Sequence, residues 1–137
     1  MKTFNHVGSE LQDLKTETIN GKRHYVTPNG KYQSITALLS NLSKAGIQAW
    51  RKRVGEEEAN RISHQASGRG TRVHNIAESY IKNQEDHLEG VLPDAFEMFQ
   101  SITPLIDRID NVHCVEGALY SDELKLAGRT DLIAEFD

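Results

Sequence analysis

The end of the chain has the pattern of two β-strands joined by a short turn. The first run extends from 112 to 120, and the second returns from 124 to 136 after the turn at Ser121-Asp122-Glu123. Both runs are rich in the branched and aromatic residues that are typical of strands. Because a two-stranded sheet is seldom stable by itself, these strands need helices over one face or further strands beside them. The rest of the fold must be built around this hairpin.

An earlier hairpin is marked by Asn20-Gly21, which separates the β-prone runs 16–19 and 22–26. Both positions of a type I′ turn need positive φ, and asparagine and glycine adopt it most easily. Pro28 and Gly30 then end the second strand in another turn. Residues 1–30 are therefore predicted to form an arm and a β-hairpin.

Helical patterns fill the chain between the two hairpins. Ser34 suits the N-cap of a helix, Gly46 interrupts that helix, and Gly55 is placed to end its second half. Ser67-Gly68-Arg69-Gly70 predicts a break before a new helix at Thr71, and Pro93 begins the last helix. The sequence thus predicts four to five helices over 34–110. Their expected buried faces are Ile35, Leu38, Leu39 and Leu42; Trp50; Val73, Ile76, Ala77, Tyr80 and Ile81; and Leu92, Phe96, Phe99, Ile102 and Ile106.

The order of elements predicts a single α+β domain, since 137 residues give room for one core. The single cysteine, Cys114, excludes an internal disulfide and reads as a small core residue of the strand 112–120. No run of about 18 apolar residues is present, so we expect no membrane-spanning segment.

The charge of the chain is divided between its two parts. Residues 1–84 carry 13 Lys and Arg against 7 Asp and Glu, a balance of +6, whereas residues 85–137 carry 3 against 13, a balance of −10. These sum to the net charge of −4. Chance clustering on solvated faces is one explanation. The other is a surface that holds phosphates beside one that collects cations.

His74 and Glu78 are spaced i, i+4 on a predicted helix, so they project from the same face one turn apart. Such a pair is either a surface ion pair or part of a site that binds a divalent cation. Just before it, Gly70 and Thr71 are expected at a helix start, where exposed N–H groups form a seat for an anion. With Arg69 and Arg72 beside them, that anion is expected to be a phosphate; the alternative is a plain helix cap.

Asp131 lies in the apolar second strand, on the same face as Arg129 and Ile133. A carboxylate buried there needs a partner, which is either Arg129 or a metal ion. Glu116 in the preceding strand adds a second carboxylate. Two acids and a histidine form an oxygen-rich site suited to Mg²⁺ or Mn²⁺ rather than zinc.

These segments, in this order, resemble the RecB-like branch of the PD-(D/E)XK nucleases, and most of all the mitochondrial genome maintenance exonuclease family and its phage relatives. The resemblance covers most of residues 30–137. The matching segments are 32–39 (YQSITALL), Trp50 with Gly55, 66–74 (ASGRGTRVH), 78–80 (ESY), 116–121 (EGALYS) and 126–134 (LAGRTDLIA).

The resemblance implies the start of a restriction-endonuclease-like sheet and assigns His74 and Asp131 to metal binding, with Glu78 and Glu116 as supporting catalytic residues. In this family the next strand carries an acidic residue, a spacer and a lysine. No such triplet follows Asp131 here, so the resemblance implies an incomplete domain with little or no nuclease activity by itself. The remaining phosphate contacts expected in the basic part are Ser34, Thr36, Arg51 and Arg53.

The expected function is therefore that of a fragment of a Mg²⁺- or Mn²⁺-dependent DNA exonuclease that hydrolyses phosphodiester bonds at single-stranded or free DNA ends. The expected location is the cytoplasm of a bacterium or of a phage-infected host cell. An exposed edge of the last strand favours a homodimer through that edge. Two alternatives remain open: a non-catalytic DNA-binding module, and a small structural or assembly protein.

Overall fold

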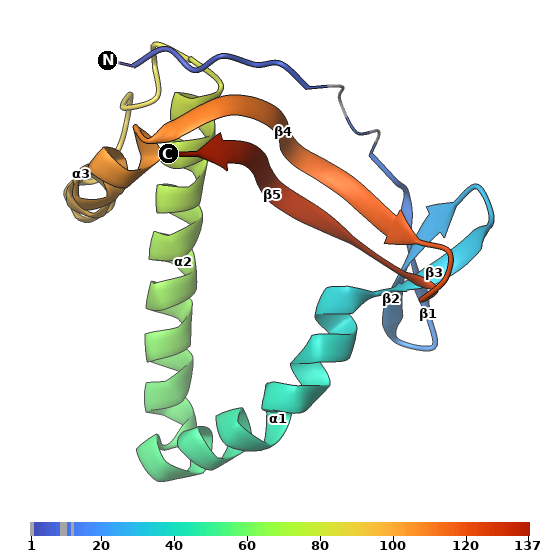
Figure 1. Cartoon of the computed structure of the whole chain (residues 1–137). Coiled ribbons are helices and arrows are strands. Elements are labelled where there is room, and N and C mark those ends of the chain that lie inside the picture. The colour runs from blue at the N-terminus through green and yellow to red at the C-terminus, as the bar shows by residue number, and fades with distance from the viewer. Residues whose placement is uncertain (1, 9–10, 12) are drawn as a thin grey trace.

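A computed structural model of the chain describes residues 2–8, 11 and 13–137. Within these residues the protein has three helices and one five-stranded mixed sheet (Figure 1). This confirms the predicted α+β class. The strands are β1 (Thr16–Ile19), β2 (Lys22–Thr27), β3 (Gly30–Ser34), β4 (Ile109–Ser121) and β5 (Leu126–Phe136); the helices are α1 (Ile35–Val54), α2 (Glu56–Ile81) and α3 (Pro93–Ile106).

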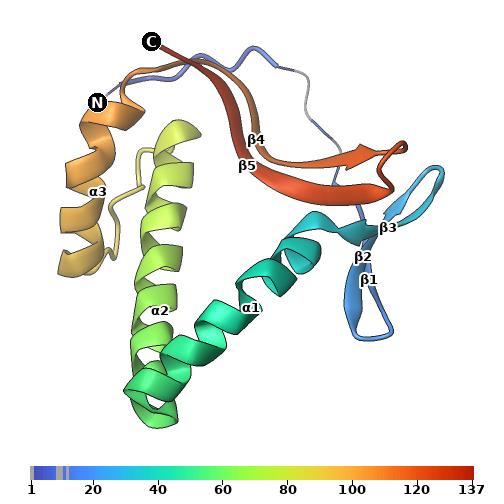
Figure 2. The same cartoon turned by 60° about the horizontal axis from the view of Figure 1, so that its bottom comes forward.

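Both predicted hairpins are present. Asn20 and Gly21 have φ of 53° and 76°, and β1 pairs with β2 in antiparallel register across them. At the other end of the chain, β4 and β5 form a long antiparallel pair that curls away from the smaller hairpin (Figure 2). The second strand was expected from residue 124, but β5 begins at Leu126. Lys125, just before it, has a φ of 56°.

The sequence did not predict β3, which joins the two hairpins into one sheet. The strand order is β1-β2-β3-β5-β4, and β3 runs parallel to β5. Only two residue pairs make this junction, Gln33 with Leu126 and Ser34 with Ala127. The start of β5 is thus covered by β3, while within the described chain the part from Gly128 onward pairs on one side only, with β4.

The prediction of four to five helices is wrong, because two expected breaks are absent. α1 continues through Gly46, and α2 continues through Gly68 and Gly70. Glycine in a helix interior costs about 1 kcal/mol relative to alanine, which is a weak penalty against an uninterrupted hydrogen-bond ladder. The C-terminal part of α2 is also anchored in the core through Ile76 and Tyr80, so tertiary packing outweighs the local glycine signal.

The main core lies where the N-terminal segment, α2, α3 and β4 meet. Phe4 and Phe99 both pack edge-on against Tyr80, with ring centroids 5.2 Å and 5.4 Å from its own. Val112 of β4 is 1% exposed beneath them. The predicted buried stripe of α2 is confirmed, with Ile76, Tyr80 and Ile81 buried and Val73 and Ala77 packed against the cluster.

The predicted apolar face of α1 is not buried. Ile35, Leu38, Leu39 and Leu42 are 41%, 41%, 53% and 82% exposed, and α1 has no buried residue. The helix is fixed at its two ends: the Ser34 hydroxyl accepts from the Ala37 N–H at 3.4 Å, and the Gly55 N–H donates to the Arg51 carbonyl at 2.9 Å. Figure 1 shows the reason, because α1 diverges from the sheet and meets α2 only at their shared turn.

In the described part of the chain, no helix combines the length and the apolar character needed to cross a membrane.

One polar link fastens the β2–β3 turn to the β4–β5 turn. The Tyr32 hydroxyl donates to Asp122, and the Asn29 side-chain amide donates to the same carboxylate at 3.1 Å. These hydrogen bonds, that from Tyr32 first, hold the pKa of Asp122 below its usual range. The same bond raises the pKa of Tyr32.

Replacing Gly70 by alanine is expected to raise the free energy of unfolding by roughly 0.5–1 kcal/mol, because Gly70 lies inside a continuous helix. A β-carbon there meets no atom within 4 Å. Urea denaturation followed by circular dichroism measures the change. Gly21→Ala is the matched control and should destabilise, since Gly21 has φ +76°. A loss of stability in Gly70→Ala would contradict the continuous helix and support the predicted break at this position.

Acid should weaken the link between the two turns. A carboxyl whose pKa is lowered on folding stabilises the protein above its ordinary pKa, 3.8 for Asp122, and this contribution is lost as the pH falls through the lowered value. We expect the urea midpoint of Asp122→Asn to fall less than that of the unsubstituted protein between about pH 5 and about pH 3. Equal falls of the urea midpoint in the two proteins would show that the ionisation of Asp122 is not coupled to folding.

Candidate metal centre

Glu116 and Asp131 face each other across the β4–β5 pair. The register aligns Val115 with Leu132 and Gly117 with Thr130, so Glu116 and Asp131 occupy the pair of positions between them. Side chains at directly opposed positions lie on the same face of the sheet with β-carbons about 4.5–5.5 Å apart, and like charges there repel. The strand pairing therefore brings together two carboxylates, the half-buried one of Glu116 and the exposed one of Asp131, and each disfavours the charge of the other.

The backbone at Glu116 is in an unusual conformation for a strand. Its φ is +55°, in the left-handed region that residues with a β-carbon rarely occupy. The next residue, Gly117, lies so close to Cys114 and Leu11 that a β-carbon would overlap the Cys114 sulfur. Strain of this kind persists only where the surroundings hold it, and it is concentrated at functional sites.

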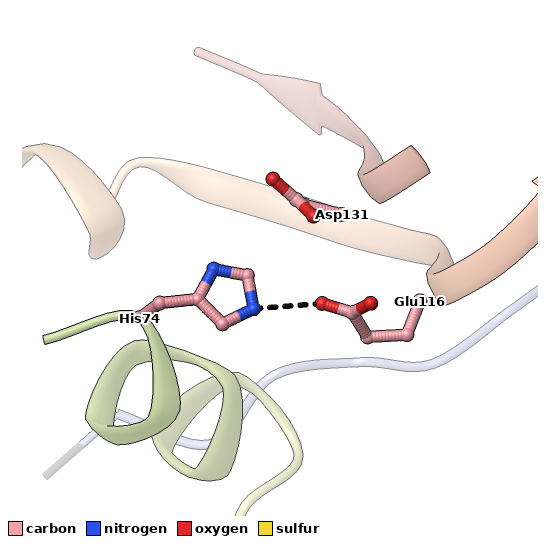
Figure 3. A group of neighbouring side chains, drawn as sticks. All are labelled: His74, Glu116 and Asp131. Carbon is pink, nitrogen blue, oxygen red and sulfur yellow. Dashed lines mark hydrogen bonds and ion pairs between the residues drawn. The ribbon is translucent and has the colours of Figure 1, made fainter. Parts of the chain in front are cut away.

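His74 reaches this carboxylate pair from α2. Its Nε2 lies 2.8 Å from Glu116 Oε1 (Figure 3). It also lies 3.7 Å from Glu78 Oε2. The side chains of His74 and Glu116 are 42% and 22% exposed. Both side chains are accessible to a ligand. The Glu116 carboxylate is partly shielded from water, which strengthens its attraction for a nearby cation.

Three atoms of ligand type come together here, one each from His74, Glu116 and Asp131, and all lie within 4.8 Å of one another. Around an octahedral ion with bonds of about 2.1 Å, neighbouring ligand atoms are about 3 Å apart and opposite ones about 4.2 Å. The 2.8 Å between His74 and Glu116 fits neighbouring positions. Small side-chain rotations would bring the third ligand into range, so these residues fit a Mg²⁺- or Mn²⁺-sized ion.

Two cations flank the cluster. Arg129 Nη2 lies 3.7 Å from Glu116 Oε2 and 3.3 Å from the Glu116 carbonyl oxygen, and Arg129 Nη1 lies 3.5 Å from Asp13. Lys82 Nζ lies 2.5 Å from Glu78 Oε1. The sequence left two partners open for Asp131, Arg129 or a metal ion, and the structure pairs Arg129 with Glu116 and Asp13 instead. The reason is geometric: Arg129 lies diagonally across the strand pair from Glu116.

The predicted anion seat at Gly70-Thr71 is absent. Both residues lie in the interior of α2, where their N–H groups belong to the helix rather than to its start. Arg72 is bound to Asp94 of α3 at 2.9 Å. With 3.6 residues per turn, Arg72 also lies about 160° around the helix from His74. Arg69 and Arg72 line a separate pocket with Asp94. They are therefore not part of the metal cluster, the name used here for His74, Glu116 and Asp131.

The other predicted phosphate contacts are spread along α1. Ser34 is 2% exposed and its hydroxyl caps the helix, so it offers almost no surface to a ligand. Thr36 and Arg53 are exposed. Arg51 is bound to Glu56 at 2.7 Å, and that hydrogen bond raises the pKa of its guanidinium. The structure does not bring these four residues to the metal cluster.

Sequence reasoning brought together His74, Glu116 and Asp131, which the structure places in one cluster, with Glu78 beside His74. It missed Lys82 as part of the surroundings of the site. The signal was present, because Lys82 continues the i, i+4 spacing of His74 and Glu78 by one more turn.

Comparisons of this chain with protein-family models, with curated proteins and with solved structures gave no match. A function for it therefore has to be argued from the geometry of the site.

Proposed function

We propose that the protein carries a nuclease-type metal site that binds Mg²⁺ or Mn²⁺ through His74, Glu116 and Asp131, and that it binds DNA. The observation that carries this proposal is the convergence of three ligand-type atoms from α2, β4 and β5 within 4.8 Å. The resemblance of the sequence to the PD-(D/E)XK nucleases supports the same reading, with His74 and Asp131 as direct ligands.

The donor set favours a hard cation. Two carboxylates and one imidazole nitrogen suit Mg²⁺ or Mn²⁺, and in the described residues no thiolate joins the cluster to favour zinc. When bound, such an ion supplies charge stabilisation at a scissile phosphate and a water of lowered pKa. The protein residues fix its position: Glu116 and Asp131 from opposed strand positions, and His74 from the adjoining helix.

A basic helix supports DNA as the substrate class. α1 carries Lys44, Arg51, Lys52 and Arg53 and contains no acidic residue. Its basic end meets α2 at the turn before Glu56. His74 lies 18 residues along α2 from Glu56, roughly 27 Å at 1.5 Å per residue. A single strand held on α1 and reaching the metal centre would thus span several nucleotides.

Metal binding is the first test. Saturating Mn²⁺ should stabilise the protein against heat, by about 2.7 kcal/mol at one hundred times the dissociation constant. Asp131→Asn and His74→Ala should lose that stabilisation, while Glu123→Gln, an acid in the β4–β5 turn, should keep it. In EDTA, Asp131→Asn should be no less stable than the unsubstituted protein, because the substitution removes a like-charge contact. Unchanged Mn²⁺ affinity in Asp131→Asn would refute the metal centre.

DNA binding is the second test, with fluorescence anisotropy of a labelled single strand of about 20 nucleotides. Reversing the charge of Lys52 and Arg53 together should weaken binding at least tenfold at low salt. It should also reduce the salt slope by about 1.4, which is about 0.7 for each lost phosphate contact. The matched control reverses Lys22 and Arg23, the adjacent basic pair of the small hairpin. Equal losses in both double variants would indicate a general charge effect and contradict a binding surface on α1.

The same measurement separates the nuclease proposal from a non-catalytic DNA-binding module. A nuclease site predicts tighter DNA binding in Ca²⁺ or Mg²⁺ than in EDTA, and loss of this gain in Asp131→Asn. A binding module predicts the same affinity in all these conditions.

A further inference from the structure

A cavity of about 530 Å³ lies between the N-terminal segment and β4, directly beside the metal centre. Glu116 forms part of its wall, and so does Lys82 from the end of α2. Leu11 and Val115 give it an apolar side, and His6 adds an imidazole. The cavity thus combines an apolar surface with polar groups at the edge of a cation site, as small-molecule pockets commonly do.

The backbone of the N-terminal segment forms one wall of this cavity by pairing with the edge of β4. The Val7 N–H donates to the Val112 carbonyl at 2.9 Å, and the Val112 N–H donates to the Asn5 carbonyl at 2.7 Å. Gly8 lies so close to β4 that a β-carbon would overlap the His113 carbonyl. The wall is therefore held by main-chain hydrogen bonds and by a glycine that permits close approach.

Among the described residues that line the cavity, Lys82 brings a positive charge and Glu116 a negative one. Lys82 is 40% exposed and lies against Glu78, a carboxylate that also approaches His74. His6 Nε2 donates to the Ile81 carbonyl at 2.8 Å. A cation held by Glu116 on one side and the Lys82 ammonium on the other would give the cavity two positive centres. A phosphate group bridges such a pair of charges well.

We propose that this cavity binds a nucleoside monophosphate, with its phosphate between Lys82 and the cation site and its sugar and base against Leu11 and Val115. The inference rests on the proposed function and extends it, because it locates the terminal nucleotide at the cavity side of the metal centre. Lys82 then contacts the phosphate, in exchange for its contact with Glu78.

The test is calorimetric titration of the full chain with thymidine 5′-monophosphate in Mg²⁺. The protein should bind the nucleotide, and Lys82→Met should weaken binding about tenfold or more, the loss expected when a charge-assisted hydrogen bond to phosphate is removed. Lys31→Met is the matched control, because Lys31 is another exposed lysine in an ion pair, 2.7 Å from Glu17. It should bind the nucleotide like the unsubstituted protein.

Three results would overturn the inference. Thymidine binding as tightly as its monophosphate would show that the phosphate is not recognised. Inorganic phosphate binding as tightly as the nucleotide would identify a simple anion site. Equal losses in Lys82→Met and Lys31→Met would remove Lys82 from the site.

A parallel Mn²⁺ titration separates this inference from the proposed function. Lys82→Met should bind Mn²⁺ normally, because Lys82 contacts Glu78 and not the three metal ligands; a loss of Mn²⁺ binding would overturn its role in phosphate recognition. If the unsubstituted protein binds Mn²⁺ but no nucleotide, the cavity assignment fails and the metal centre stands. If it binds nucleotide through Lys82 without binding Mn²⁺, the cavity assignment stands and the proposed function fails.

Discussion

The antiparallel pairing of β4 with β5 is the interaction on which the rest of the structure depends. It places Val112 at the bottom of the main core and Ala127 in the smaller core with Tyr25 and Tyr32. Its register also decides which side chains oppose one another. A slip of one residue would turn every side chain of one strand to the other face and separate Glu116 from Asp131. Folding and the candidate chemistry therefore depend on the same set of hydrogen bonds.

That register has an electrostatic cost that the protein offsets with neighbouring cations. Glu116 and Asp131 repel at opposed positions, and Glu116 further adopts a left-handed backbone conformation. Arg129 approaches Glu116 and lowers the repulsion, and His74 hydrogen-bonds to Glu116, while both carboxylates stay within reach of a ligand. Retaining two acids on a strained strand is the kind of local conflict that proteins show at functional sites.

The sequence predicted those features whose signals are local. Asn20-Gly21, the Ser34 cap and the Gly55 helix end each follow from the stereochemistry of one or two residues. The core stripe of α2 followed from periodicity, and the convergence of His74 with the two carboxylates from the likeness of several motifs together. What could not be predicted depends on partners outside the segment itself. β3 is a strand because it pairs with β2 over residues 30–33 and with β5 at Gln33 and Ser34, and α2 passes through Gly70 because packing further along anchors it.

The exposed face of α1 is another feature that the sequence pattern alone could not predict. It also bears on where DNA could bind. Periodicity shows that Leu38, Leu39 and Leu42 lie on one side, but it does not show whether another element lies against them. In the structure α1 is held at its two ends, so these side chains remain exposed along its first half. The basic residues Arg51, Lys52 and Arg53 lie in its last turn. If the protein binds DNA as proposed, a phosphate backbone would follow the end of α1 that adjoins α2, rather than the end that adjoins the sheet.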